Sequence, residues 1–229
     1  IILVHADFLP LLEEILPLVK RDVQLILLSD DSSCDSESSF DFLTTYDAMM
    51  AQSVDHFVFP DFDERMCATT FYTTGTTGEP KAVAYSHRQL VLHTMGLLAG
   101  LGPIETSNRL HAGDVYMPIT PMFHVHAWGF PYAATLLGIK QVYAGRYTPE
   151  NLIRLIVEEG VTFSHCVPTI LQMLLSASEA VNTDLSKLKM LIGGSALPYG
   201  LAEAAMARGI NVYSGYGMSE TCPVLTISA

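Results

Sequence analysis

Residues 139–167 read IKQVYAGRYTPENLIRLIVEEGVTFSHCV and hold one complete strand–helix–strand unit. The apolar runs Ile139–Tyr143 and Val161–Val167 predict two strands. Between them, Pro149 marks the start of a helix and Gly160 its end, because proline suits the first helical turn and glycine the left-handed residue after the last. Two strands joined by a helix usually lie parallel in one sheet.

The same alternation continues on both sides of this unit. Downstream, the sequence predicts a helix from Pro168 to Leu175, a strand at Lys189–Ile192, a helix from Pro198 to Gly209 and a strand at Asn211–Ser214. Upstream, Ser86 and Gln89 form a capping box that predicts a helix to about Ala99. Repeated units of this kind predict an α/β fold, with a mainly parallel sheet and helices on both faces.

Composition narrows the functional classes. The chain has 229 residues, of which 49% are hydrophobic, and 12 Lys and Arg against 24 Asp and Glu give a net charge of −12. This balance repels nucleic acid and anionic membrane surfaces. Residues 1–65 hold 3 basic and 14 acidic side chains, and residues 66–229 hold 9 and 10. The contrast predicts an acidic first segment, 1–65, and a nearly neutral second region, 66–229.

Several simple features bear on location. No apolar run reaches about 18 residues, so no transmembrane helix is predicted. The four cysteines, Cys34, Cys67, Cys166 and Cys222, form no CxxC pair, which favours a reducing compartment and hence the cytoplasm. The chain lacks a start methionine and begins within a predicted strand, so it is expected to be a piece of a longer protein.

Three polar, glycine-containing segments follow predicted strands: Thr73–Lys81, Gly193–Ala196 and Gly215–Glu220. In parallel α/β sheets, ligands bind at the carboxyl ends of the strands. We therefore expect these segments to form one ligand site.

The first segment, Thr73–Lys81, combines four threonines and two glycines with a lysine. Glycines allow successive backbone N–H groups to point at one anion, hydroxyl groups add donors, and Lys81 adds positive charge, as a polyphosphate requires. The Walker pattern fails, because Lys81 follows Pro80 and precedes Ala82. The alternative is a surface turn without a ligand.

The third segment resembles a dinucleotide fingerprint in only two glycines, because Glu220 stands where the last glycine would be. A carboxylate repels a diphosphate unless a cation lies between them, so Glu220 suggests Mg²⁺. The alternative is an exposed glutamate at the start of a helix. In the second segment, the GxSxG pattern of a nucleophilic serine fails at Leu197, and small residues suit a backbone lying against a planar ligand. Tyr216 could stack on that plane.

His124 and His126 form an HxH pair, for which metal binding and a place in the lining of a pocket are both open. Trp128, the only tryptophan, lies in an apolar stretch where a core position is the default expectation.

Together, these residues resemble the AMP-forming adenylate synthetases, and most closely their medium- and long-chain fatty acyl-CoA ligases. The motifs that carry this resemblance are Tyr72–Lys81, Tyr85–Arg88, Met122–Trp128, Pro131–Ala134, Gly193–Ala196 and Tyr216–Thr221. The resemblance implies a large-domain fragment in which 66–229 is the AMP/ATP-binding core with the phosphate loop and the acyl-channel region. The ribose-binding aspartate and the small C-terminal domain with its catalytic lysine would come later in the family's chains.

By the same resemblance, a fatty carboxylate attacks ATP to give acyl-AMP and pyrophosphate, and coenzyme A then displaces AMP. The implied phosphate ligands are Thr73, Thr74, Gly75, Thr76, Thr77, Gly78 and Lys81. The other implied nucleotide-binding residues are Gly194, Ser195, Ala196, Gly215, Tyr216, Gly217 and Ser219. Thr73 and Glu220 would bind Mg²⁺, and His124 and Trp128 would contact the acyl substrate. Lys81, His124, Ser219 and Glu220 are the implied catalytic residues.

Alternative functions remain open at this point. The acceptor could be a carrier protein instead of coenzyme A, or the chain by itself could be a non-catalytic nucleotide-binding fragment. Ala82 departs from the family's usual glycine after the lysine. Because long-chain relatives often pair, the resemblance also suggests a homodimer.

Overall fold

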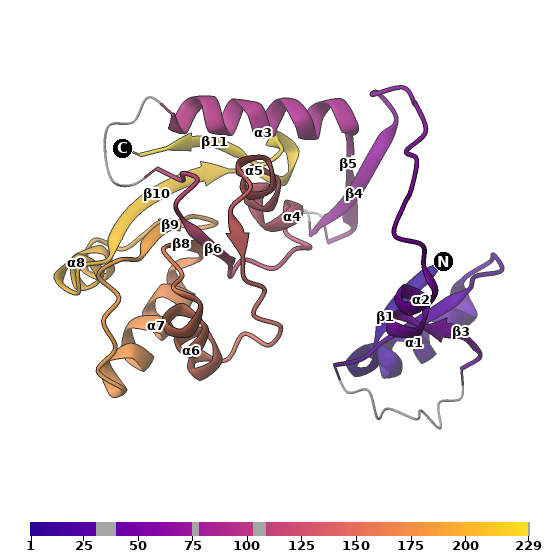
Figure 1. Cartoon of the computed structure of the whole chain (residues 1–229), viewed down its shortest axis with the longest axis horizontal. Coiled ribbons are helices and arrows are strands. Elements are labelled where there is room, and N and C mark those ends of the chain that lie inside the picture. Colours follow the sequence, from indigo (N-terminus) through magenta and orange to yellow (C-terminus); the bar gives the residue numbers. More distant parts are fainter. Residues whose placement is uncertain (31–39, 75–77, 103–108, 229) are drawn as a thin grey trace. The chain divides into compact units, whose positions relative to one another are not determined.

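The computed structural model describes residues 1–30, 40–74, 78–102 and 109–228 of the chain (Figure 1). The chain folds into two compact units, Ile1–Asp61 and Phe62–Ala229. Each unit has its own sheet and its own buried cluster, so each is described by itself.

The first unit contains a parallel three-stranded sheet in the order β1-β2-β3. Its elements are β1 (Ile2–His5), η1 (Ala6–Phe8), α1 (Leu9–Ile15), η2 (Leu16–Leu18), β2 (Leu25–Leu28), β3 (Phe42–Thr45) and α2 (Tyr46–Gln52). Val4, Leu12 and Leu25 form its small buried core.

The second unit is built on a six-stranded sheet in the order β11-β10-β9-β8-β6-β7. Its strands are β6 (Val115–Pro118), β7 (Lys140–Gln141), β8 (Phe163–Cys166), β9 (Lys189–Ile192), β10 (Asn211–Gly217) and β11 (Val224–Ile227). All neighbours pair in parallel except β10 and β11. The α/β prediction is therefore confirmed. Strand β10 runs three residues past the predicted end at Ser214, because β11 pairs with Gly215, Tyr216 and Gly217.

Helices cover both faces of this sheet, as Figure 1 shows for the second unit. They are α3 (His87–Leu101), α4 (Val125–Trp128), α5 (Phe130–Leu137), α6 (Pro149–Glu159), α7 (Pro168–Ala180) and α8 (Tyr199–Ala207), with a 3₁₀ turn η3 (Ser219–Thr221). The predicted capping box is present: Ser86 accepts from the Gln89 amide, and the Gln89 side chain accepts from the Ser86 amide. Gly160 ends α6 in the left-handed conformation, as its position predicts.

Alternation along the strands separates two cores. Side chains such as Met117, Met190 and Ile192 pack against α6, α7 and α8. Their neighbours Tyr116 and Leu191 face the other way and pack with α3 and α5. This period of two is what a sheet buried on both faces requires.

The predicted phosphate loop lies outside the main sheet. Strands β4 (Cys67–Thr74) and β5 (Pro80–Ser86) pair with each other as an antiparallel hairpin, with Thr73 opposite Lys81 and Thr69 opposite Tyr85. The expectation that this loop follows a strand of the parallel sheet is therefore wrong. The short connection between two strands allows antiparallel pairing, whereas a parallel pair needs a long crossover.

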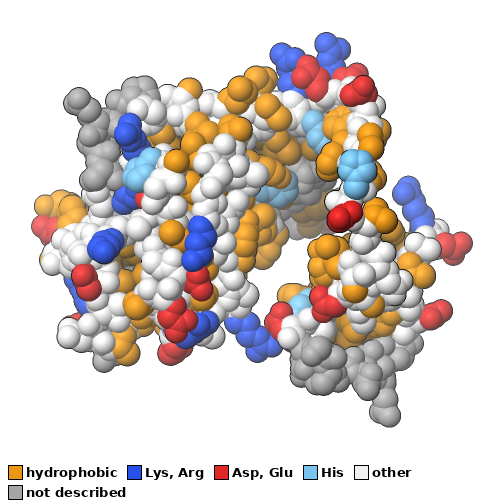
Figure 2. Space-filling model, viewed as in Figure 1, with side chains coloured by type: hydrophobic (Ala, Val, Ile, Leu, Met, Phe, Trp, Pro, Cys, Tyr) orange, Lys and Arg blue, Asp and Glu red, His pale blue; other side chains and the backbone are white. Residues whose placement is uncertain are grey.

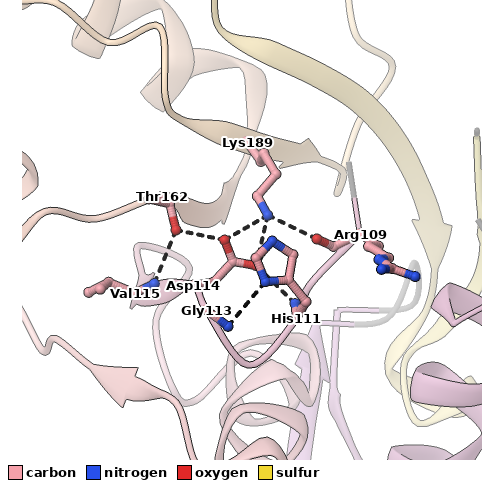
Figure 3. A network of polar contacts seen from close by, with 7 residues as sticks. All are labelled: Arg109, His111, Gly113, Asp114, Val115, Thr162 and Lys189. Carbon is pink, nitrogen blue, oxygen red and sulfur yellow. Dashed lines mark hydrogen bonds and ion pairs between the residues drawn. The ribbon is translucent and has the colours of Figure 1, made fainter. Parts of the chain in front are cut away.

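A buried ion pair joins strands at the amino end of the main sheet (Figure 3). Lys189 Nζ lies 2.6 Å from Asp114 Oδ1, and both side chains are almost fully buried. Asp114 also accepts hydrogen bonds from the Thr162 hydroxyl at 2.7 Å and the His111 amide at 2.9 Å, and Lys189 donates to the Arg109 carbonyl at 2.9 Å. This cluster connects the segments before β6 and β8 with the first residue of β9.

Charges of both signs are mixed over the face of the second unit seen in Figure 2. On the described part of that face no large patch of one sign stands out, which agrees with the nearly neutral count for residues 66–229. An anionic ligand would therefore have to be held by local groups. None of the helices in the described ranges combines the length and the apolar character needed to cross a bilayer.

Candidate active site

A cavity of about 230 Å³ lies at the carboxyl end of the main sheet. Its lining consists of His124, Val125, Trp128, Leu191, Gly193, Gly194, Gly215, Tyr216, Gly217, Met218, Ser219, Pro223 and Val224. Three segments far apart in the sequence thus meet in one place: the turn around His124–Trp128, the Gly193–Gly194 pair after β9, and the end of β10 with the turn that follows it.

Trp128 forms one wall of this cavity. A Cβ atom on Gly193 would lie 3.1 Å from Trp128 Cη2 and 3.0 Å from the Gly215 carbonyl oxygen, so the indole lies close against the chain here and a larger residue would crowd it. Trp128 is partly exposed. The default expectation of a core position is therefore only half met, because the indole packs on the core and also borders the cavity.

The turn that carries Trp128 has an unusual backbone. The four residues Val125–Trp128 all have positive φ, between 48° and 59°, so α4 is a left-handed turn. Such geometry costs L-residues roughly 1–2 kcal/mol each. Side-chain contacts hold it in place: His126 Nε2 is hydrogen-bonded to the Thr69 hydroxyl at 3.2 Å, and His126 Nδ1 to the Tyr132 hydroxyl.

The metal interpretation of the HxH pair does not fit this geometry. Both ring nitrogens of His126 are occupied by Thr69 and Tyr132, while His124 lines the cavity. Within the described ranges, no group of three His, Cys, Asp or Glu side chains could hold a metal ion. His124 is therefore placed as a lining residue.

A fully buried histidine, His165, packs against the Trp128 ring. His165 Nε2 lies 2.6 Å from the Tyr116 hydroxyl and Nδ1 lies 2.9 Å from the Thr120 hydroxyl. Its ring centroid is 5.1 Å from that of Trp128. Burial lowers the pKa of His165 from 6.5 to about 3, so the ring is neutral in the folded protein at neutral pH. No motif in the sequence points to His165.

Acidification is expected to weaken the fold through His165. Its pKa is 6.5 when unfolded and about 3 when folded, so the unfolded chain binds a proton that the folded chain excludes. Stability is lost as the pH falls from 6.5 toward 3, and between pH 7 and pH 5 the loss is about 2 kcal/mol. The thermal unfolding midpoints of full-length wild type and His165→Gln, measured at pH 7, 6 and 5, should converge as the pH falls. A constant gap would contradict the prediction.

The turn after β10 is tightly folded. A Cβ on Gly217 would lie 2.1 Å from the Pro223 carbonyl oxygen, so β10 and the end of the turn require glycine at this point. The Met218 amide donates to the Pro223 carbonyl at 3.1 Å, and the Thr221 amide donates to the Met218 carbonyl at 3.0 Å. These bonds present Ser219 to the cavity and leave Glu220 exposed beside it.

The hairpin β4–β5 packs against both turns. Successive side chains along each strand point to opposite faces of the hairpin. Phe71 and Tyr85 lie on the buried face, and Tyr72 lies on the exposed face. The Phe71 ring lies 4.6 Å from that of His126, and the Tyr85 hydroxyl accepts a hydrogen bond from the Cys222 amide at 3.1 Å. Thr73 and Lys81 belong to the same face, nearer the hairpin tip.

The sequence-predicted residues are therefore distributed in three groups. The cavity brings together His124, Trp128, Gly194, Gly215, Tyr216, Gly217 and Ser219. Outside its lining lie Thr73, Gly78 and Lys81 on the hairpin, Ser195 and Ala196 after β9, and Glu220 in η3. Outside the described residues lie Gly75, Thr76, Thr77 and the side chain of Thr74.

Sequence reasoning missed the residues that support this site. Val125, Leu191, Pro223 and Val224 line the cavity, and His165 and Tyr85 lie behind its walls. The sequence offered one signal for these residues, which was their position within or next to a strand end or a motif.

Comparison with known proteins gives a consistent result. Residues 2–229 match the family described as AMP-binding enzyme. A long-chain-fatty-acid–CoA ligase of Thermus thermophilus is 38% identical over 98% of this chain and 39% of its own length. A medium-chain-fatty-acid–CoA ligase of Ectopseudomonas oleovorans is 36% identical over 97% of this chain and 40% of its own length. The chain thus spans about two fifths of the length of these curated relatives.

A solved structure shares the fold. A long-chain-fatty-acid-CoA ligase from Archaeoglobus fulgidus superposes with a TM-score of 0.79, covering 99% of this chain and 44% of that one. The two sequences are 22% identical, so this likeness concerns the fold alone.

Proposed function

Because this chain belongs to the AMP-binding enzyme family, we propose that it forms the nucleotide- and acyl-binding part of a fatty acyl-CoA ligase. The enzyme would join a medium- or long-chain fatty acid to ATP, giving acyl-AMP and pyrophosphate, and then transfer the acyl group to coenzyme A. The relatives from Thermus thermophilus and Ectopseudomonas oleovorans are named as ligases of long- and medium-chain fatty acids, which supports this substrate class.

The cavity at the carboxyl end of the sheet is the observation that carries the proposal. It joins an aromatic and apolar wall, formed by Trp128, Leu191 and Val224, to the stretch 215–219, which offers two glycines, the Tyr216 ring and the Ser219 hydroxyl. An acyl adenylate has the matching two halves, a hydrocarbon chain and a planar base with a polar linker. In this assignment the adenine would lie along Gly194–Ala196 and Gly215–Gly217, with Tyr216 against its plane.

The attack brings a carboxylate to a polyphosphate, so charge neutralisation and alignment must provide much of the catalysis. We assign the phosphates to residues 73–78 of the sequence and to Lys81. Ser219 would donate to the α-phosphate, and His124 would lie beside the reacting carboxylate. With these roles, the phosphates would be bound by groups from the hairpin and from the turn after β10.

Mg²⁺ fits the donors that are present. Glu220 offers an exposed carboxylate and Thr73 a hydroxyl group, and both are the hard oxygen ligands that this ion takes. Mg²⁺ at a nucleotide usually has only one or two protein carboxylates, because phosphates and water fill the remaining positions. Bound there, the ion would neutralise phosphate charge, while Glu220 and Thr73 would fix its place.

The remaining assignments concern the whole protein. We propose residues 66–229 as the AMP/ATP-binding core and residues 1–65 as a partial preceding segment of the large domain. Cys67, Cys166 and Cys222 are free thiols, which supports a cytoplasmic location. A homodimer stays a prediction from the family resemblance.

Trp128→Ala in the full-length enzyme is expected to change how the acyl chain is handled. Removing the indole opens the apolar wall, so the KM for the preferred fatty acid should rise about tenfold and the chain-length profile should shift. The KM for ATP should change less than about threefold. Steady-state kinetics with acids of increasing length measure both effects. Tyr199→Ala is the control, because Tyr199 is an exposed ring on α8 outside the cavity lining. An unchanged profile in Trp128→Ala would remove Trp128 from the acyl site.

Isotope exchange tests the first half-reaction directly. With ATP, Mg²⁺ and a fatty acid but no coenzyme A, the full-length protein should incorporate labelled pyrophosphate into ATP. Exchange should require the fatty acid, because pyrophosphate leaves only when the acyl adenylate forms. Failure to exchange with any acid of a broad panel would count against the proposal.

A further inference from the structure

A hydrogen bond joins the hairpin to the turn after β10. The Tyr85 hydroxyl, on β5, accepts from the Cys222 amide at 3.1 Å, although the two residues are 137 positions apart. The Tyr85 ring is only 4% exposed and packs in a cluster with Phe71 and Val125. Packing of the ring therefore fixes the position of the hydroxyl, and the hydroxyl's hydrogen-bond partner is a backbone amide of the turn.

Each end of this hydrogen bond lies close in the sequence to residues that are proposed to bind Mg²⁺ or ATP. Tyr85 lies four residues from Lys81 on β5, which places both side chains on one face of a paired strand, with Thr73 opposite Lys81. On the donor side of the hydrogen bond, Cys222 lies two residues after Glu220 in the sequence. Cys222 has a φ of 70°, and the Thr221 amide bonds to the Met218 carbonyl, so little freedom remains between residues 218 and 222.

Electrostatics agree with this proximity. Burial raises the pKa of the Tyr85 hydroxyl, the hydrogen bond from the Cys222 amide lowers it, and smaller electrostatic contributions from Cys222 and Glu220 raise it.

We propose that Tyr85 is a positioning residue, whose hydroxyl fixes the turn that carries Glu220 relative to the hairpin that carries Thr73 and Lys81. The role rests on the proposed function, in which these residues bind the Mg²⁺–ATP complex from two separate elements. Tyr85 itself touches neither ATP nor Mg²⁺. It sets the spacing between the groups that do.

Tyr85→Phe in the full-length protein tests this role, because it keeps the packed ring and deletes only the hydroxyl. Tyr213→Phe is the matched control: Tyr213 is also buried, and its hydroxyl has no hydrogen-bond partner in the described part of the chain. Calorimetric titration of ATP at a series of Mg²⁺ concentrations gives the Mg²⁺ concentration for half-maximal binding. Hydrogen exchange gives the protection of the Cys222 amide.

In Tyr85→Phe, the half-maximal Mg²⁺ concentration should rise about three- to tenfold, as expected for the loss of one positioned hydrogen bond. The Cys222 amide should exchange faster by a similar factor. The KM for the fatty acid and the Tyr213→Phe control should stay at wild-type values, and ATP binding without Mg²⁺ should weaken less than ATP binding with Mg²⁺.

Three results would overturn the inference, and they differ from one another. If the wild type shows Mg²⁺-dependent ATP binding and Tyr85→Phe responds to Mg²⁺ like wild type, only the role of Tyr85 fails. If ATP and fatty-acid binding fall together with the thermal midpoint, Tyr85 supports the fold and has no specific role. If wild-type ATP binding is itself insensitive to Mg²⁺, the assignment of Glu220 and Thr73 fails along with that of Tyr85.

Discussion

Replacing Asp114 by alanine is expected to lower the local free energy of unfolding of the β8 and β9 strands by about 3–5 kcal/mol. The change leaves the ammonium group of Lys189 buried without its counter-charge, and the side chain of Lys189 is only 8% exposed. It also removes the acceptor of the Thr162 hydroxyl and the His111 amide. Hydrogen exchange of the β8 and β9 amides in the full-length protein measures the loss.

An exposed ion pair provides the control for Asp114. Arg154 and Glu158 pair on α6 with both side chains about half exposed, and such pairs contribute only about 0.3–0.5 kcal/mol. Glu158→Ala should therefore leave exchange in β8 and β9 nearly unchanged. If Asp114→Ala were as mild as Glu158→Ala, the cluster would not have the structural importance that its burial indicates.

Glu220→Gln in the full-length enzyme is expected to lower Mg²⁺-dependent turnover about 100-fold or more. The amide keeps the shape of the side chain and removes the negative charge proposed to bind Mg²⁺. Because Glu220 is exposed, the thermal unfolding midpoint should barely change. Turnover measured across a range of Mg²⁺ concentrations, together with the midpoint, separates the two effects.

Glu203→Gln is the control for Glu220, since Glu203 is an exposed glutamate on α8 outside the cavity lining. It should retain wild-type turnover. Wild-type turnover in Glu220→Gln as well would remove Glu220 from the site and leave Mg²⁺ without its proposed protein carboxylate.

Local sequence signals predicted much of the fold. The Ser86–Gln89 capping box, Pro149 at the start of α6 and Gly160 at its end act within one helical turn, so neighbouring residues determine them. The parallel sheet followed from the repeated strand–helix pattern. Strand lengths were less accurate. Strand β7 has two residues where five were predicted, and β10 gains three, because pairing partners elsewhere in the chain decide where a strand ends.

The candidate site was predictable as a set of motifs and much less as a geometry. Seven of the predicted residues line one cavity, since the ends of parallel strands meet at one edge of a sheet. The left-handed turn at Val125–Trp128 could not be predicted, because none of its residues is a glycine and tertiary contacts such as those of His126 hold it. The same reason applies to His165 and Tyr85, whose partners lie far away in sequence.

Product analysis tests the central claim most directly. The full-length protein, incubated with ATP, Mg²⁺, a fatty acid of medium or long chain and coenzyme A, is predicted to yield AMP, pyrophosphate and acyl-CoA in equal amounts. Omitting the fatty acid should abolish AMP formation. Formation of ADP in place of AMP, or of AMP without an acyl-CoA thioester, would contradict the assignment of this chain to a fatty acyl-CoA ligase.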